Sequence, residues 1–166
     1  MNETKNPKED HLIGPHHRFV FGATTAIITN LGLIMALFHT TNPKLNIIGS
    51  ILAVALADNI SDSLGIHIHQ ETERLKTREV WISTVTNFGA RLLVSLIFVL
   101  VIYLFPLFPA TVALTTLGMV LLSVISYFVA ISRNRNPYHA VFEHISIAIF
   151  VITASHIVGQ WIESRF

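Results

Sequence analysis

The sequence predicts an all-α membrane protein with five transmembrane helices, and three observations support this fold class. Of the 166 residues, 52% are hydrophobic and only 13% are charged, which leaves too few charges to solvate a globule of this size. The mean hydropathy is +0.60. Five apolar segments of about 20 residues, the length that crosses a bilayer core of roughly 30 Å, are separated by short turns with proline or clustered charge.

The segments follow a polar tail at residues 1–17 and form one predicted domain over residues 18–166. The turns are Asn42-Pro43, a charged connector at 70–80 that leads into an interfacial stretch at 81–87, Pro106 to Pro109, and Asn136-Pro137. The expected spans are therefore about 19–38, 46–68, 88–105, 110–131 and 139–162.

The basic residues predict the orientation of these spans. One side of the membrane receives the N-terminus and the turns after spans two and four, and it holds Lys5, Lys8, Arg18, Arg74, Lys76, Arg78, Arg91, Arg133 and Arg135. The other side holds only Lys44 and Arg165. Cytoplasmic loops carry an excess of lysine and arginine, so we expect a cytoplasmic N-terminus and a C-terminus outside.

The second span carries charges where a membrane helix normally has none. Asp58, Asp62, Gly65 and His69 fall on one helical stripe, with Ser61 beside it. A charge at bilayer depth costs roughly 2.5–3.5 kcal/mol, so such residues usually face a protein interior and serve a function. Carboxylates, hydroxyls and imidazoles on one face favour a cation site over a polar cluster that only joins helices.

Other polar residues are candidates for the same site. Asp58 and Asp62 are the expected ligands, with neutral oxygens from Asn30, Thr25 and Ser61, while His67, His69 and Glu71 would form the cytoplasmic entrance. For Glu143, which precedes His144, two interpretations stay open: it caps a helix or meets nearby arginines, or it joins the site. Arg91, near the start of the third span, is expected to extend to the interface, or else to pair with an aspartate.

The composition also limits which metal ligands and which classes of function are possible. Cysteine is absent, so a metal would be held by oxygen, imidazole nitrogen or thioether, which favours Fe, Mn, Co or Zn over Cu(I). A net charge of +1 without a long basic run gives no sign of nucleic-acid binding. Ser155-His156 lacks the context of a hydrolase nucleophile, and we expect no enzyme activity.

Three short segments of the sequence resemble the motifs of a known membrane-protein family. Residues 22–29 read Gly-Ala-Thr-Thr-Ala-Ile-Ile-Thr, residues 60–67 read Ile-Ser-Asp-Ser-Leu-Gly-Ile-His, and residues 105–109 read Phe-Pro-Leu-Phe-Pro. With five spans and these motifs, the chain resembles the vacuolar iron transporter family over about residues 18–166. The family's first span reads roughly Gly-Ala-x-Asp-Gly-Leu-Val-Ser/Thr and its second Leu-Ser-Met-Ala-x-Gly-Glu-Tyr.

The chain departs from that pattern at three chemically important positions. Thr25 stands where the family has aspartate, Asp62 where it has methionine, and Ile66 where it has glutamate. The short connector replaces a cytoplasmic metal-binding insert that typical members carry between spans two and three. The resemblance therefore implies divalent-cation transport more strongly than it implies iron as the cargo.

The resemblance also implies a homodimer, with the pore between the subunits and the first two helices at the two-fold axis. The expected function is export of a divalent metal from the cytoplasm in exchange for protons, without a resident cofactor, and the expected location is the cell membrane of a prokaryote. Two alternatives remain: an assembly protein in which Arg91 or shared protons neutralise a structural aspartate pair, and an organic-cation transporter.

Overall fold

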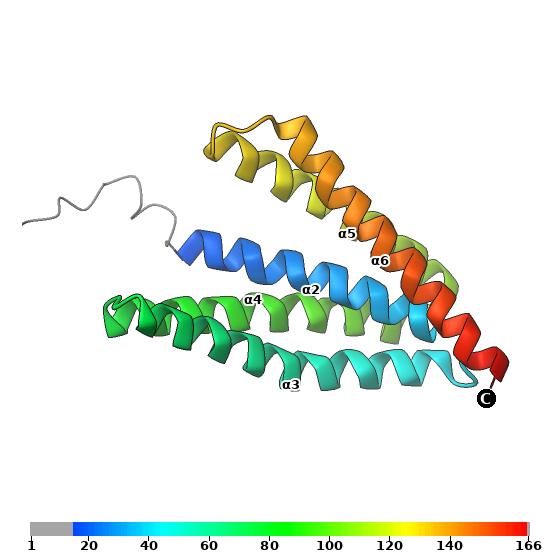
Figure 1. Cartoon of the computed structure of the whole chain (residues 1–166). Coiled ribbons are helices and arrows are strands. Elements are labelled where there is room, and N and C mark those ends of the chain that lie inside the picture. Colours follow the sequence, from blue (N-terminus) through cyan, green and yellow to red (C-terminus); the bar gives the residue numbers. More distant parts are fainter. Residues whose placement is uncertain (1–14, 166) are drawn as a thin grey trace, which may run out of the picture.

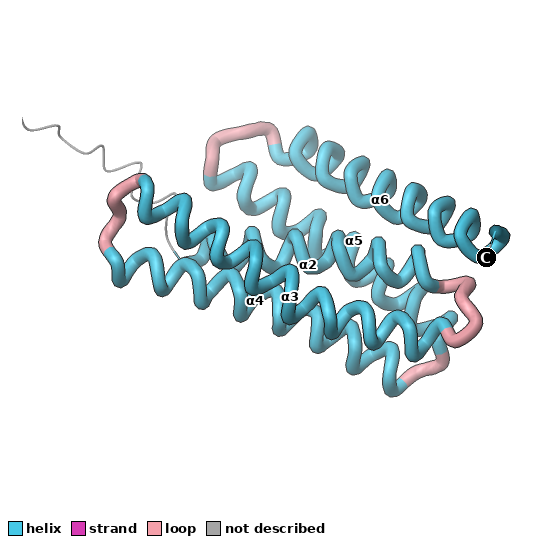
Figure 2. The backbone as a smooth tube through the Cα atoms, turned by 60° about the horizontal axis from the view of Figure 1, so that its bottom comes forward, coloured by secondary structure: helices cyan, strands magenta, loops and turns pink. Residues whose placement is uncertain are grey.

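The structure, a computed structural model, describes residues 15–165, and all of its regular elements are α-helices. Their bounds are α2 Pro15–Leu37, α3 Pro43–Thr72, α4 Thr77–Leu104, α5 Leu107–Ser132 and α6 Pro137–Arg165 (Figures 1 and 2). Each of the five is long and apolar enough to cross a membrane. The structure thus supports an all-helical integral membrane protein, as the sequence predicts.

All five helices begin before the predicted spans and three of them end after, and the difference is largest around the connector at 70–80. α3 continues to Thr72 and α4 begins at Thr77, so the turn is only a few residues long, with Arg74 in the left-handed conformation at φ 58°. The stretch at 81–87 is therefore part of α4. Residues 1–14 of the predicted tail lie outside the described residues, and residues 15–17 open α2.

Successive helices run in opposite directions between two ends of the bundle. The start of α2, the α3–α4 turn and the α5–α6 turn lie at one end, and the C-terminus lies at the other (Figure 1). We call these the N-terminal and C-terminal ends. At the N-terminal end, Arg74 and Lys76 lie between α3 and α4, Arg78 lies in the first turn of α4, and Arg133 and Arg135 lie between α5 and α6. The predicted cytoplasmic side is this end.

α2 is the central helix, packing against α4 on one side and α6 on the other, while α3 packs mainly against α4. Two glycines allow the close contacts of α2. A Cβ at Gly22 would lie 2.7 Å from the Asn87 carbonyl oxygen, and one at Gly159 of α6 would overlap the Ala36 carbonyl. The close approach of α2 to α4 brings polar groups of both helices near the second-span aspartates of α3.

The buried interior changes character along the bundle. Its apolar part contains Ile27, Leu31 and Ile34 of α2, together with Ile47, Ile51, Phe98, Ile102, Ala110 and Leu114 of the other helices. Its polar part lies closer to the N-terminal end, mostly between α3 and α4. Large apolar side chains such as Leu56, Ile60 and Leu64 remain exposed on the outside, as expected for a surface that meets lipid.

Candidate cation site

Most of the buried polar residues form one continuous interface between the antiparallel helices α3 and α4. On α4, Ser83, Asn87, Arg91 and Ser95 recur every fourth residue and are all buried. Their hydrogen bonds to α3 run in antiparallel order. Ser83 accepts from Gln70, Asn87 donates to Ser63, and Arg91 donates to Asn59. We call this set the α3–α4 polar interface. A four-residue period keeps such side chains on one helix face.

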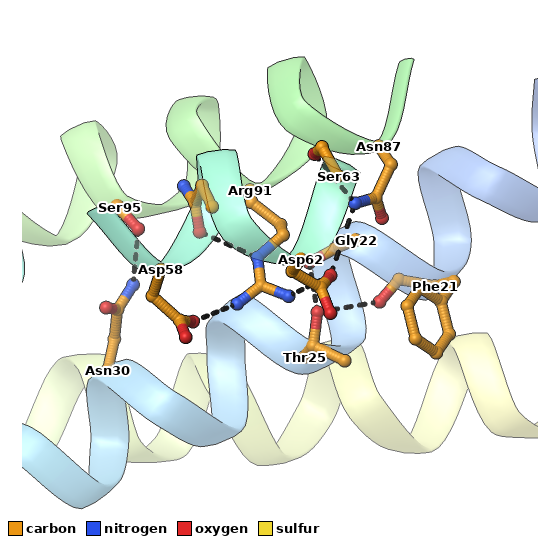
Figure 3. Close-up of polar contacts among 11 residues, drawn as sticks. Phe21, Gly22, Thr25, Asn30, Asp58, Asp62, Ser63, Asn87, Arg91 and Ser95 are labelled. Carbon is orange, nitrogen blue, oxygen red and sulfur yellow. Dashed lines mark hydrogen bonds and ion pairs between the residues drawn. The ribbon is translucent and has the colours of Figure 1, made fainter. Parts of the chain in front are cut away.

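Arg91 holds both aspartates of α3. Its Nη2 lies 2.5 Å from Asp58 Oδ2, its Nη1 lies 2.6 Å from Asp62 Oδ2, and its Nε donates to Asn59 Oδ1 at 2.7 Å (Figure 3). Asn87 donates a further hydrogen bond to Asp62 Oδ2 at 3.3 Å. One guanidinium is thus shared by two carboxylates and an amide, and we call Asp58, Asp62 and Arg91 the Asp–Arg cluster.

The prediction that Arg91 extends to the membrane interface is wrong. Because α4 begins at Thr77 and ends at Leu104, Arg91 lies at the middle of the helix, about 21 Å from its start at 1.5 Å per residue. Its side chain is only 5% exposed. Asp58 likewise lies at the middle of α3, which runs from Pro43 to Thr72. The pairing that the sequence left as the second interpretation is the one observed.

The two carboxylates differ in their access to the surroundings. The Asp58 side chain is 55% exposed and that of Asp62 is 34% exposed, so the cluster opens to the outer surface of the chain. Each carboxylate uses its Oδ2 for Arg91, and within residues 15–165 neither Oδ1 atom accepts a hydrogen bond. Each aspartate therefore keeps one oxygen free for another ligand.

The charges of the cluster do not balance when all three groups are ionised. Two carboxylates and one guanidinium leave one negative charge in the middle of two apolar helices. An uncompensated charge in a low-dielectric region is costly, so either a proton or a cation is needed for neutrality. Two buried amide atoms beside the cluster, Asn59 Nδ2 and Asn87 Oδ1, have no partner among the described residues.

The predicted neutral ligands do not join the cluster. Asn30 is buried and donates to Ser95 of α4 at 3.1 Å. The Thr25 hydroxyl donates to carbonyl oxygens of its own helix, at Phe21 and Gly22. Ser61 lies exposed on α3, one turn from Asp58. Of the predicted ligands, only Asp58 and Asp62 therefore contact Arg91.

The predicted entrance residues lie near the N-terminal end and form their ion-pair contacts within their own helix. His67 Nε2 lies 3.3 Å from Glu71, and His67 Nδ1 lies 3.0 Å from the Thr84 hydroxyl. His69 lies 3.4 Å from Glu73. Glu143, on α6, lies 4.0 Å from His139. Within the described part of the chain, no three histidine or acidic side chains converge to hold a metal ion.

The sequence interpretation missed Asn59 of α3 and Asn87 of α4, which hydrogen-bond to the Asp–Arg cluster, and it named Arg91 as a partner only in its second alternative. A signal for Asn87 and Arg91 was present, because residues 83, 87, 91 and 95 are all polar at a four-residue period in a helix that is otherwise largely apolar. Comparison of the chain with models of protein families, with curated proteins and with solved structures finds no match.

Proposed function

We propose that the protein is a membrane transporter that exports a divalent metal ion from the cytoplasm in exchange for protons. One observation supports this most strongly: Asp58 and Asp62 share Arg91 at the middle of two membrane-length helices, which leaves one negative charge. A charge at that depth is expensive unless it has a function. The resemblance to the vacuolar iron transporter family points to the same class of cargo.

The excess charge supplies the chemical basis for exchange. A proton and a metal ion would compete for the same excess negative charge, because either one can neutralise it. Binding of a cation favours full ionisation, so the proton would leave as the metal arrives. The free Oδ1 atom of the half-exposed Asp58 is the group that a cation would reach first.

A homodimer would complete the site. One exposed stripe of α3 carries a small residue at every fourth position, namely Gly49, Ala53, Ala57, Ser61 and Gly65. Small residues at this spacing let two membrane helices approach closely, and Asp58 follows Ala57 directly. Two copies related by a two-fold axis along this face would bring two Asp–Arg clusters together.

The charge of such a dimer would match a divalent ion. Four carboxylates and two guanidiniums, all ionised, sum to two negative charges, which one dication neutralises. Carboxylate oxygens are hard ligands and suit Mn(II) and Fe(II) better than soft ions. With the N-terminal end in the cytoplasm, as its basic turns favour, the predicted entrance at His67 and Glu71 would face the cytoplasm of a prokaryotic cell.

A structural role for the cluster is the second candidate, and the hydrogen bonds of Arg91 favour it. All three guanidinium nitrogens have partners, as expected for a cluster that fastens α3 to α4. The structural role and the transport function differ in how many carboxylates they need beside Arg91. A purely structural cluster needs only one carboxylate per arginine, whereas a transporter needs both.

The function is tested by reconstituting the full chain in vesicles that contain a metal-sensitive dye or a pH dye. Addition of Mn(II) outside should quench the metal dye and raise the interior pH, since protons leave as the metal enters. Mn(II) entry no faster than in protein-free vesicles would refute transport. Mn(II) entry without a pH change would refute proton exchange and leave a passive channel.

A further inference from the structure

A mostly apolar pocket that contains two histidines lies away from the Asp–Arg cluster, toward the C-terminal end of the bundle. It is a cavity of about 400 Å³ between the last turns of α2, the first turns of α5 and the second half of α6. Its lining includes Met35, His39, Thr111, Thr115 and His156. Within residues 15–165, no acidic or basic side chain other than these histidines lines it.

Two buried polar atoms at this cavity have no hydrogen-bond partner among the described residues. They are His156 Nδ1 and Thr111 Oγ1, and Thr111 is only 7% exposed. Buried polar atoms are nearly always satisfied, so each exception calls for an explanation. Two exceptions in the lining of one cavity indicate a ligand that offers groups to both.

The two imidazoles of the cavity are spaced as ligands of one metal ion would be. The ring centroids of His39 and His156 lie 5.0 Å apart, with the ring planes inclined by 57°. Two imidazole nitrogens bound to one tetrahedral ion at about 2.0–2.1 Å place their ring centroids roughly 5 Å apart. The pair comes from different elements, since His39 follows α2 and His156 lies on α6.

We propose that His39 and His156 bind a late first-row divalent ion such as Zn(II), Ni(II) or Co(II). Imidazole nitrogen suits these ions, whereas Mn(II), Mg(II) and Ca(II) prefer carboxylate and carbonyl oxygens. Water molecules would fill the remaining coordination positions, and Thr111 would hydrogen-bond to one of them. The proposed transport function is not required, because neither histidine contacts Asp58, Asp62 or Arg91.

The proposal is tested with the full chain in detergent, by titration calorimetry with Zn(II) and by thermal unfolding with and without Zn(II). His39→Gln and His156→Gln should each remove one equivalent of bound Zn(II). The double variant should lose no more than either single variant, because both residues serve one ion. Zn(II) should also raise the thermal midpoint of the parent, because it joins the segment after α2 to α6. In both single variants, Zn(II) should raise the midpoint by less.

His139→Gln is the matched control, because His139 lies at the start of α6, at the N-terminal end, beside Glu143, and this variant should bind as much Zn(II) as the parent. Mn(II) should not occupy the site. Unchanged Zn(II) binding in both single variants would overturn the proposal. Losses of bound Zn(II) that add up in the double variant would also overturn it, since additive losses would indicate that the two histidines bind Zn(II) independently. His39 is exposed, so its variant remains a valid test even if His156→Gln fails to fold.

Discussion

Arg91→Gln should destabilise the protein more than replacement of either aspartate alone. The substitution leaves Asp58 and Asp62 without their shared cation in the middle of two apolar helices. Removing one partner of a fully buried ion pair costs about 3–5 kcal/mol, because the other charge stays uncompensated, and the partial exposure of Asp58 and Asp62 reduces this cost here. Thermal unfolding in detergent, followed by helical circular dichroism, should show a large drop in the midpoint.

The charge balance of the cluster predicts which variants recover. Asp58→Asn leaves one carboxylate and one guanidinium, so this variant should be nearly as stable as the parent. Asp58→Asn with Asp62→Asn leaves the guanidinium alone and should be strongly destabilised. Adding Arg91→Gln to that pair should restore much of the loss, because no charge remains. A destabilised Asp58→Asn, or an Arg91→Gln as stable as the parent, would contradict this electrostatic account.

The second large effect is on transport. Asp58→Asn should reduce Mn(II) flux by about tenfold or more while the protein stays folded, because the remaining Asp62–Arg91 pair is neutral and no longer attracts a dication. Hydrogen bonds and contacts to charged groups are worth about 1.5–3 kcal/mol, and each 1.4 kcal/mol is tenfold in affinity. Asp62→Asn should reduce flux in the same way.

Glu143→Gln is the matched control for this experiment. The substitution makes the same change from carboxylate to amide, and among the described residues the only ion-pair contact of Glu143 is with His139 at 4.0 Å. Mn(II) flux should therefore persist in this variant. Full flux in both aspartate variants would exclude the Asp–Arg cluster as the transport site. A stable parent protein that shows no flux, together with single aspartate variants that are as stable as the parent, would favour the structural role, because that role needs only one carboxylate per arginine.

The number and type of helices could be predicted from the sequence because the signals are local. Five apolar stretches and the proline-containing turns, such as Asn42-Pro43 and Asn136-Pro137, are visible without tertiary information. The start of α4 was placed too late because residues 81–87 are polar enough to resemble an interfacial segment. In the structure, Ser83 and Asn87 of that segment are buried against α3, a tertiary contact that hydropathy does not reveal.

The site could be predicted only in part for the same reason. Asp58 and Asp62 were identified because charges interrupt an apolar helix. Their partner Arg91 was misplaced, since its depth depends on where α4 begins and its contacts depend on how α3 and α4 align. Asn30 was expected beside the aspartates because it lies at a similar depth in the membrane. Depth alone does not determine which way a side chain points, and the Asn30 amide donates to Ser95 instead.

The central claim is that the Asp–Arg cluster binds a divalent ion, and the most direct measurement is the structure of the protein in a bilayer-like environment soaked with Mn(II). Anomalous difference density should show one ion per pair of chains, beside the Asp58 carboxylates at the two-fold axis, with Arg91 still bound to Asp62. Density should be absent in Asp58→Asn. A parent structure at saturating Mn(II) with no density at Asp58, and with Arg91 bridging both aspartates unchanged, would contradict the claim.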